Sequence, residues 1–240
     1  MRELVLLVVF QNLLNKVAHN GAAKMLYEVH KKLDFNNIDN VIIFGAISGK
    51  KEKNTLDLGT SYVMFSWFLQ GFMSKIGINV GIIRATTELL FDAVLFIKLV
   101  VLSRKYRISK CITTNAWQPI STKYLKNLGV KLVLLAGNPN DNIISDVVIN
   151  EKLRLGIKGY DPFDLPIRNW MFNKTLKNFD GIVAINELIK SSFLKNQNKI
   201  TIHHILGVFP SDIIESGHHK DETKSSKIVF GYIGHTTILE

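Results

Sequence analysis

The chain has 240 residues, of which 47% are hydrophobic, so it is long enough to bury a sizeable core. Its formal net charge of +10 fits three kinds of partner: nucleic acid, an anionic membrane surface or a phosphorylated ligand. Because the lysines are dispersed and no compact nucleic-acid-binding motif occurs, a nucleic-acid binder would rest on charge alone, and we expect no nucleic acid. The single cysteine, Cys111, excludes an intrachain disulfide, suits a reducing compartment and is interpreted as a buried apolar side chain.

The first half of the chain begins with a βαβ pattern. Leu4–Phe10 is a continuous apolar run, which is typical of a central parallel strand. Ala22–Leu33 has apolar residues at helical spacing, and Asn40–Phe44 is a second strand that must pair in parallel with the first. For the segments between and beyond them we expect loops at Gln11–Gly21 and Ser48–Leu58, a helix at Ser61–Ile76, a short strand within Gly77–Ile83 and a long helix at Thr87–Tyr106.

The second half continues this alternation. The predicted strands are Lys110–Thr114, Lys131–Ala136, Phe179–Ile185 and Ile200–Ile205. The predicted helices are Pro119–Leu128, Asn142–Lys158, Ile167–Asn178 and Asn186–Lys195. Repeated alternation predicts an α/β fold, with a Rossmann-like, doubly wound, mainly parallel sheet and helices on both faces. Between two of the helices, Asp161–Asp164 is interpreted as a turn.

The end of the chain predicts a second domain. The strand-like run Ile228–Phe230 is followed by Gly231 and Gly234, which is how an α/β domain opens, and a charged segment precedes it. We therefore expect one domain over residues 1–210, a charged linker over 211–226, and over 227–240 the first strand of a second domain that is mostly missing.

Two segments bear on membrane contact. Leu58–Ser74 carries no charged residue, but its serines and glycines favour a buried or interfacial helix over a membrane-spanning one. Ile167–Phe179 interleaves aromatic and basic residues, so it is either a membrane-interface segment or an ordinary surface helix. No convincing signal peptide is seen, and the expected location is the cytoplasm, with peripheral contact to the membrane as an option.

Motifs that would identify other enzyme classes are absent from the sequence. There is no dinucleotide fingerprint, P-loop, hydrolase elbow or Asp-x-Asp pair. The pairs His203–His204 and His218–His219 are read as structural or solvated, because adjacent strand residues point to opposite faces and no cysteine set accompanies them. We therefore predict no metal and no cofactor.

In a doubly wound sheet, ligands bind beyond the carboxyl ends of the strands, which selects particular loop residues. Asn115 and Asn138 follow apolar strands, and each either faces a ligand or caps a turn. Trp117 either stacks on a sugar or base or packs in the core. Asn20 and Gly21 either present backbone N–H groups to an anion or simply begin a helix.

Three segments resemble the glycosyltransferases of the GT-B fold, particularly the GT4-like group. Phe179–Asn186 with the following helix resembles the segment that closes the family's N-terminal domain, with Asn186 in place of the usual Ser. Ile202–Pro210 resembles the strand and turn before the interdomain linker, with Leu206 in place of Asn. Phe230–His235 resembles the strand and glycine turn that open the donor-binding domain.

The resemblance implies a glycosyltransferase that moves a sugar from a nucleotide-sugar co-substrate to a glycan or lipid-linked acceptor without a metal, in polysaccharide biosynthesis. This chain would carry mainly the acceptor-side domain, with a donor domain supplied in cis or trans. The resemblance assigns the acceptor side to the loops of Gly21 and Asn138, and the donor to the opening of the second domain. The predicted acceptor-binding residues are therefore Asn20, Gly21, Asn115, Trp117 and Asn138, and the predicted donor-binding residues are Gly231, Gly234 and His235. The catalytic residue is unknown, because Gly137 and Asn138 stand where the family has its catalytic His. The alternative is a non-catalytic Rossmann-like subunit that completes an enzyme with a partner chain.

Overall fold

The structure is a computed structural model that describes residues 3–9, 13–14, 17–18, 21–36, 39–44, 55–58, 60–158, 161, 163–194 and 200–204. All of these belong to one compact unit, Met1–Gly207. The predicted linker over 211–226 and the strand predicted over 227–240 lie outside the described residues, so the domain division stays a prediction.

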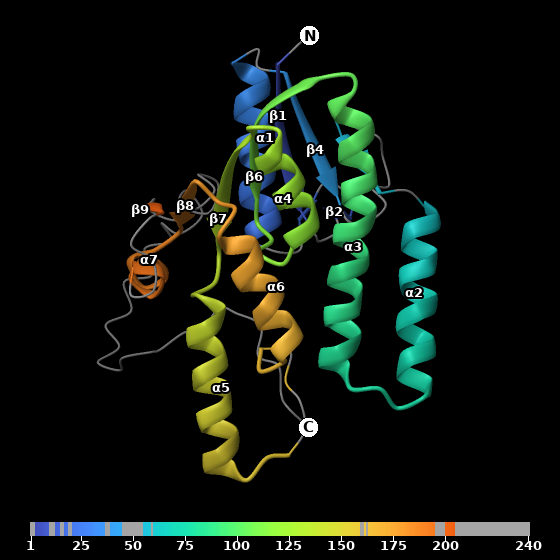
Figure 1. The fold of residues 1–240 in the computed structure, drawn as a ribbon, viewed down its shortest axis with the longest axis vertical. Coiled ribbons are helices and arrows are strands. Elements are labelled where there is room, and N and C mark those ends of the chain that lie inside the picture. Colours follow the sequence, from blue (N-terminus) through green and yellow to red (C-terminus); the bar gives the residue numbers. More distant parts are fainter. Residues whose placement is uncertain are drawn as a thin grey trace, which may run out of the picture. The chain divides into compact units, whose positions relative to one another are not determined.

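An open seven-stranded sheet runs through the unit (Figure 1). In spatial order its strands are β5 (Thr55–Asp57), β4 (Asn40–Phe44), β1 (Glu3–Val9), β6 (Arg107–Thr113), β7 (Lys131–Ala136), β8 (Gly181–Ala184) and β9 (Thr201–His204). Every neighbouring pair is parallel. The chain winds outward from β1 to β4 and β5, then returns to the other side of β1 with β6, so the strand order reverses between β1 and β6. This reversal confirms the doubly wound prediction.

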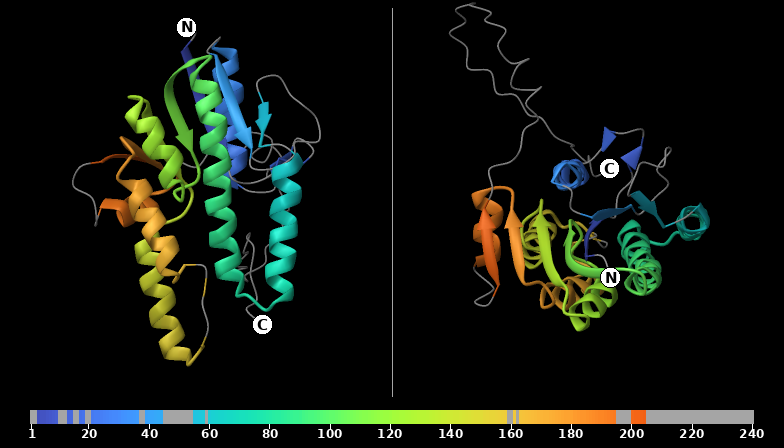
Figure 2. Two further views of the ribbon diagram at one scale, coloured as in Figure 1. Left: turned by 45° about the vertical axis from the view of Figure 1, so that its right-hand side comes forward. Right: turned by 90° about the horizontal axis from the view of Figure 1, so that it is seen from above.

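The helices lie on both faces of the sheet. They are α1 (Gly21–Phe35), α2 (Thr60–Lys75), α3 (Val80–Ser103), α4 (Pro119–Asn127), α5 (Asp141–Leu155), α6 (Pro166–Leu176) and α7 (Glu187–Leu194). Seen from above in Figure 2, α1 lies on one side of the sheet and α3, α4 and α6 lie on the other. Among the described helices, none combines the length and the hydropathy that crossing a bilayer requires.

Strand β1 is buried on both faces, which explains its unbroken apolar sequence. Leu6 and Val8 belong to the core that includes α3, α4, α6 and α7. Leu7 and Val9 point the other way and pack in the smaller core with Leu26 of α1. The alternation follows from the two-residue period of a strand, and both sets are almost fully buried. A polar side chain anywhere in this run would therefore be removed from water, because neither face of the strand is exposed.

Three predictions about local structure were wrong. The loop predicted at Ser48–Leu58 contains β5, and the loop predicted at Gln11–Gly21 contains the short antiparallel strands β2 (Leu13–Leu14) and β3 (Val17–Ala18). The short strand predicted within Gly77–Ile83 is instead a turn followed by the first residues of α3, which begins seven residues before the predicted Thr87. Gly77 has a positive φ of 75°, and the side chain of Asn79 accepts a hydrogen bond from the Gly81 N–H, so this local cap starts the helix despite its β-branched residues.

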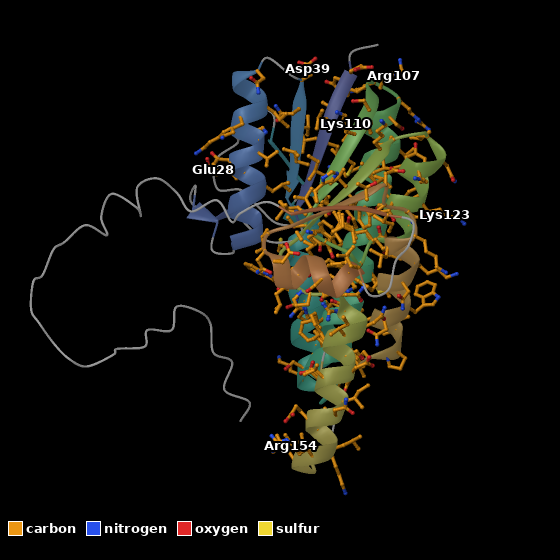
Figure 3. All side chains as sticks on the ribbon, turned by 90° about the vertical axis from the view of Figure 1, so that its left-hand side faces the viewer. Glu28, Asp39, Arg107, Lys110, Lys123 and Arg154 are labelled. Carbon is orange, nitrogen blue, oxygen red and sulfur yellow. The ribbon has the colours of Figure 1, made fainter. Side chains whose placement is uncertain are left out.

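Basic side chains are spread over the unit rather than gathered in one patch. Arg107 and Lys110 lie at one end of the sheet and Arg154 lies at the far end of α5, with Lys123 between them (Figure 3). The dispersal seen in the sequence therefore persists in three dimensions.

Candidate functional site

The carboxyl ends of the parallel strands share one edge of the sheet, and the loops after β6, β7 and β8 are described there. Asn115 and Trp117 follow β6, next to the point where the strand order reverses, and Asn138 follows the neighbouring strand β7. Of the loop after β1 only β2 and β3 are described, and residues 45–54 after β4 lie outside the described residues. The fold thus brings three of the five predicted acceptor residues to neighbouring loops, where open α/β sheets bind their ligands.

Asn115 is buried and organises the turn after β6. The Thr113 hydroxyl oxygen accepts a hydrogen bond from the Asn115 backbone N–H (3.0 Å), and Asn115 Oδ1 accepts one from the Trp117 N–H (3.1 Å). The Thr113 hydroxyl donates to Gln118 Oε1 (3.2 Å). The turn-capping role considered from the sequence is therefore present. Within the described residues, Asn115 Nδ2 has no hydrogen-bond partner.

Trp117 joins the β6 loop to two helices. Its indole Nε1 donates to Asp141 Oδ2 at the start of α5, over 2.7 Å. The guanidinium of Arg168 in α6 lies 3.8 Å from the centre of the ring, within the range of a cation–π interaction. The side chain is half-buried, so one part packs internally and another part stays accessible at the sheet edge. The packing considered from the sequence is therefore present, and contact with a ligand stays a prediction.

Arg168 is the centre of a buried ionic cluster. It is completely buried, with Nε 3.3 Å from Glu88 Oε2 and Nη1 3.7 Å from Asp141 Oδ2. The Phe163 ring also packs against the guanidinium: the Arg168 Cζ atom lies 4.4 Å from the centre of the ring. Arg84 adds a second cation, 3.3 Å from Glu88 Oε1, at a half-exposed position. The cluster holds α3, α5 and α6 together, and removing one partner would leave a buried charge uncompensated.

Burial dominates the electrostatics of the two carboxylates. It raises the pKa of Asp141 to about 6, although the Arg168 charge and the Trp117 hydrogen bond oppose the shift. Burial also raises the pKa of Glu88, against the attraction of Arg168 and Arg84. Asp141 therefore changes its charge near neutral pH, and perturbed carboxyls of this kind are common near functional sites.

Asp92 of α3 caps α4 from outside the helix. Its carboxylate accepts hydrogen bonds from the backbone N–H groups of Ile120 (2.8 Å) and Ser121 (3.0 Å). The residue at the usual capping position, Gln118, makes no such side-chain bond, and its own N–H donates to Thr175 Oγ1 (3.0 Å). Since the capping acid lies far away in sequence, α4 and its preceding loop are fixed by tertiary contacts.

Asn138 is exposed in the loop between β7 and α5. Two residues later, Asn140 caps α5: its Oδ1 accepts from the Asn142 N–H (3.0 Å), and its own N–H donates to Ser192 Oγ in α7 (3.0 Å). Asn186 similarly caps α7 by accepting from a backbone N–H at 2.8 Å. The Asn138 amide is thus displayed on a loop whose far end is fixed.

The other predicted site residues are placed less completely. Gly21 is the first residue of α1, which agrees with a helix start, while Asn20 lies outside the described residues. The predicted donor residues Gly231, Gly234 and His235 also lie outside them. These assignments stay predictions.

No metal centre forms in the described part of the chain. The described residues contain no group of three or more His, Cys, Asp or Glu side chains able to hold an ion. His203 and His204 lie on edge strand β9, opposite Val183 and Ala184. Cys111 is buried in the core, where burial raises the pKa of its thiol to about 12, so it is an inert apolar side chain as predicted.

The sequence did not reveal the ionic cluster. Arg168 was read as part of a basic, aromatic surface segment, but the structure buries it together with Met171 and Phe172. A signal was present in α3: Glu88 and Asp92 lie four residues apart among apolar residues, on the side that packs inward. Carboxylates on an inward helix face need a buried cation or N–H donors, and Arg168 and the start of α4 supply these.

Comparison with known proteins gives matches in structure only. No protein-family model matches the sequence, and no curated protein does. A UDP-glucosyltransferase from Polygonum tinctorium that can glucosylate indoxyl aligns over 90% of this chain and 54% of its own, with a TM-score of 0.54 and 12% identity. Os79 from O. sativa, in complex with UDP, aligns over 91% of this chain and 54% of its own, with a TM-score of 0.53 and 13% identity. The chain spans about half the length of these solved structures, and the likeness shows a fold of the GT-B type.

Proposed function

We propose that this chain is the acceptor-side half of a GT-B glycosyltransferase, and that a second Rossmann-like half binds the nucleotide-sugar donor. The observation that supports this is the likeness over nine-tenths of the chain to about half of each UDP-dependent relative. In the proposed reaction, the bond between the anomeric carbon of the sugar and the nucleotide's phosphate oxygen breaks. A new bond forms from that carbon to an acceptor hydroxyl oxygen, whose proton passes to a base.

The acceptor would bind at the carboxyl edge of the sheet, beside the reversal of strand order. The accessible part of the Trp117 indole would stack on a sugar ring, while the buried ionic cluster beneath it holds the ring in place. The exposed Asn138 amide would exchange hydrogen bonds with acceptor hydroxyl groups. On the donor side, the glycine turn at Gly231 and Gly234 would let backbone N–H groups approach the diphosphate.

The finer assignments are part of the proposal. One of the similar structures is a UDP-glucosyltransferase that can glucosylate indoxyl and the other is a complex with UDP, so UDP-sugars are the first donors to test. We retain a GT4-like enzyme that acts without a metal on a glycan or lipid-linked acceptor, at the cytoplasmic side of a membrane, in polysaccharide biosynthesis. The three segments that resemble that group support this choice.

The test uses the longest natural reading frame that contains this chain, assayed for nucleotide release from UDP- and GDP-sugars with a panel of glycan and lipid-linked acceptors. Asn138→Ala removes a hydrogen-bonding amide, so we expect the KM for the acceptor to rise roughly three- to tenfold, with the KM for the donor unchanged. The matched control is Asn36→Ala, which removes an equally exposed amide at the end of α1, before β4.

Two results would contradict the proposal. The first is the absence of turnover with every sugar nucleotide. The second is tight binding of a UDP-sugar by the 240-residue chain alone in isothermal titration, because the proposal assigns the donor to the other half. Equal effects of Asn138→Ala and Asn36→Ala would remove Asn138 from the acceptor site while leaving the overall activity in place.

A further inference from the structure

Helix α2 presents an apolar face to the outside. The exposed side chains of this α2 face are Met64, Phe65, Trp67, Phe68, Phe72 and Ile76. Trp67 and Phe68 are 66% and 69% exposed. At about 200 Å² for each large side chain, the face presents on the order of 700 Å², more than the largest apolar patch of a typical monomer. Such a patch indicates a surface that is covered when the protein works.

Unlike an ordinary amphipathic surface helix, α2 is apolar on its outward side as well as on its inward side. Its inward side carries Tyr62, Ser66 and Met73, and Ser66 is a polar residue among the buried ones. Phe68 and Phe72, one turn apart, stack outside with their ring centres 6.3 Å apart and their planes 13° from parallel. Packing within the unit therefore does not explain why this helix is so apolar.

Among the described elements, only α3 flanks α2 closely, on its inner side. Figures 1 and 2 show α2 at the margin of the unit, with no other described helix against its outward side. The segment Leu58–Ser74 also contains no Asp, Glu, Lys or Arg. The α2 face is thus continuous and uncharged, and nothing in the described chain covers it.

The exposed charges of the two described helices at this margin have one sign. Within α2 and α3, the exposed charged side chains are Lys75, at the end of α2, and Arg84 and Lys98 on α3. The acidic residues of the two helices, Glu88 and Asp92, are fully buried. An apolar face on a pair of helices whose exposed charges are all positive is complementary to a lipid surface with negative headgroups. A second copy would bring the same positive border and a further net charge of +10, which opposes self-association.

We propose that the α2 face docks the protein on an anionic lipid bilayer. Met64, Phe65, Trp67, Phe68, Phe72 and Ile76 enter the boundary between headgroups and acyl chains, and the surrounding basic residues meet the headgroups. Sixteen residues at 1.5 Å each give about 24 Å, shorter than the roughly 30 Å hydrocarbon core, and Tyr62 and Met73 hold the helix to the unit. The helix therefore lies on the membrane and does not cross it. This inference does not depend on the proposed sugar-transfer activity.

The experiment is sedimentation of the 240-residue chain with vesicles of phosphatidylcholine mixed with phosphatidylglycerol, and with vesicles of phosphatidylcholine alone. We expect binding to the mixed vesicles and much weaker binding to the neutral ones. The variant Trp67→Ser/Phe68→Ser should lower the partition coefficient by on the order of tenfold for each aromatic side chain removed. Both side chains are mostly exposed, so circular dichroism and the melting temperature should stay close to those of the wild type.

The matched control is Leu128→Ser/Leu188→Ser, which removes two exposed apolar side chains from α4 and α7. It should leave vesicle binding unchanged. The proposal is overturned if the wild type does not bind the mixed vesicles, or if both double variants lose binding equally. It is also overturned if light scattering finds a dimer that only Trp67→Ser/Phe68→Ser dissociates while vesicles bind neither protein, because the occupant is then a second copy.

Discussion

Replacing Arg168 with Met should destabilise the fold strongly at neutral pH. The substitution keeps an apolar stem of similar length but removes the only fully buried cation of the cluster in the described structure, whose nitrogens lie 3.3 Å from Glu88 and 3.7 Å from Asp141. Because both carboxylates would then be buried beside an apolar group, we expect a loss of about 3–5 kcal/mol in the free energy of unfolding. Urea unfolding at pH 7 measures this loss directly.

The matched control is Arg84→Met. Arg84 lies at the same 3.3 Å from Glu88, but its side chain is 43% exposed, so water already screens the pair. We expect this substitution to lower the free energy of unfolding by less than about 1 kcal/mol. Two arginines at equal distance from one carboxylate thus separate the effect of burial from the effect of distance.

The cost of Arg168→Met should grow with pH. In the wild type, burial raises the pKa of Asp141 to about 6 and also raises that of Glu88, and Arg168 opposes both shifts. Without Arg168, both folded-state pKa values rise further above their unfolded values. A carboxyl with a raised folded pKa contributes stability below its unfolded pKa of about 4 and loses it as the pH rises through the folded pKa. For Asp141, the stability gap should therefore be small below about pH 6 and should widen as the pH rises from there through the higher folded pKa of the variant.

Carboxyl NMR titration should place the midpoint of Asp141 near pH 6 in the wild type and higher in Arg168→Met. Two outcomes would refute the reasoning. One is a loss in Arg84→Met as large as that in Arg168→Met. The other is a stability gap that stays constant between pH 4 and pH 8, which would mean that the carboxylates do not feel the missing charge.

Three further substitutions test individual contacts. Asp92→Ala should lower the free energy of unfolding by about 2–4 kcal/mol, because two backbone N–H donors of α4 lose their acceptor. Asp92→Asn should lower it by less, because the amide keeps one acceptor oxygen. Equal losses in the two variants would contradict the capping role. Asn79→Ala should lower it by about 1 kcal/mol, which is 2–4 °C in Tm for a chain of this size, and an unchanged Tm would show that α3 needs no cap. Partial burial of Asp180 is outweighed by its hydrogen bonds from the Lys126 ammonium and the Leu132 N–H, which hold its pKa below the usual value. Asp180→Asn should therefore lower stability at pH 7 by under about 1 kcal/mol. The difference should shrink as the pH falls below the unfolded pKa of about 4 and vanish once the folded carboxyl is also protonated; a difference that persists in strong acid would exclude the ionic contact.

The sequence could predict those strands and helices whose own residues show both the apolar pattern of the element and the residues that end it. Lys131–Ala136 was predicted with the bounds that β7 has, because five successive apolar residues follow Lys131 and end at a glycine. The predicted helix Asn186–Lys195 differs from α7 by one residue at each end. β5 was missed because three residues within a polar segment carry too little periodicity, and their place in the sheet depends on pairing with β4.

The candidate site divides in the same way. The position of Asn115, Trp117 and Asn138 at one edge of the sheet follows from the parallel direction of the strands, which the alternation of strands and helices predicts. The contacts of these residues do not. The Asp141 carboxylate that accepts from Trp117 is 24 residues away in sequence, and Arg168, which stacks on the same ring, is 51 positions from Trp117.

The order of residues alone determined that this chain builds a parallel, doubly wound sheet. Apolar runs of strand length alternate with segments whose apolar residues recur at helical spacing, and such helices bury their apolar faces against a parallel sheet. The tertiary structure decided which charges are buried and which apolar residues are not. Arg168 is buried because three helices meet around it, and Trp67 and Phe68 are exposed because α2 turns its narrow inward side to α3. Hydrophobicity along a sequence is a property of each residue, whereas burial is a property of the neighbours that the fold brings to it, and those neighbours are distant in sequence.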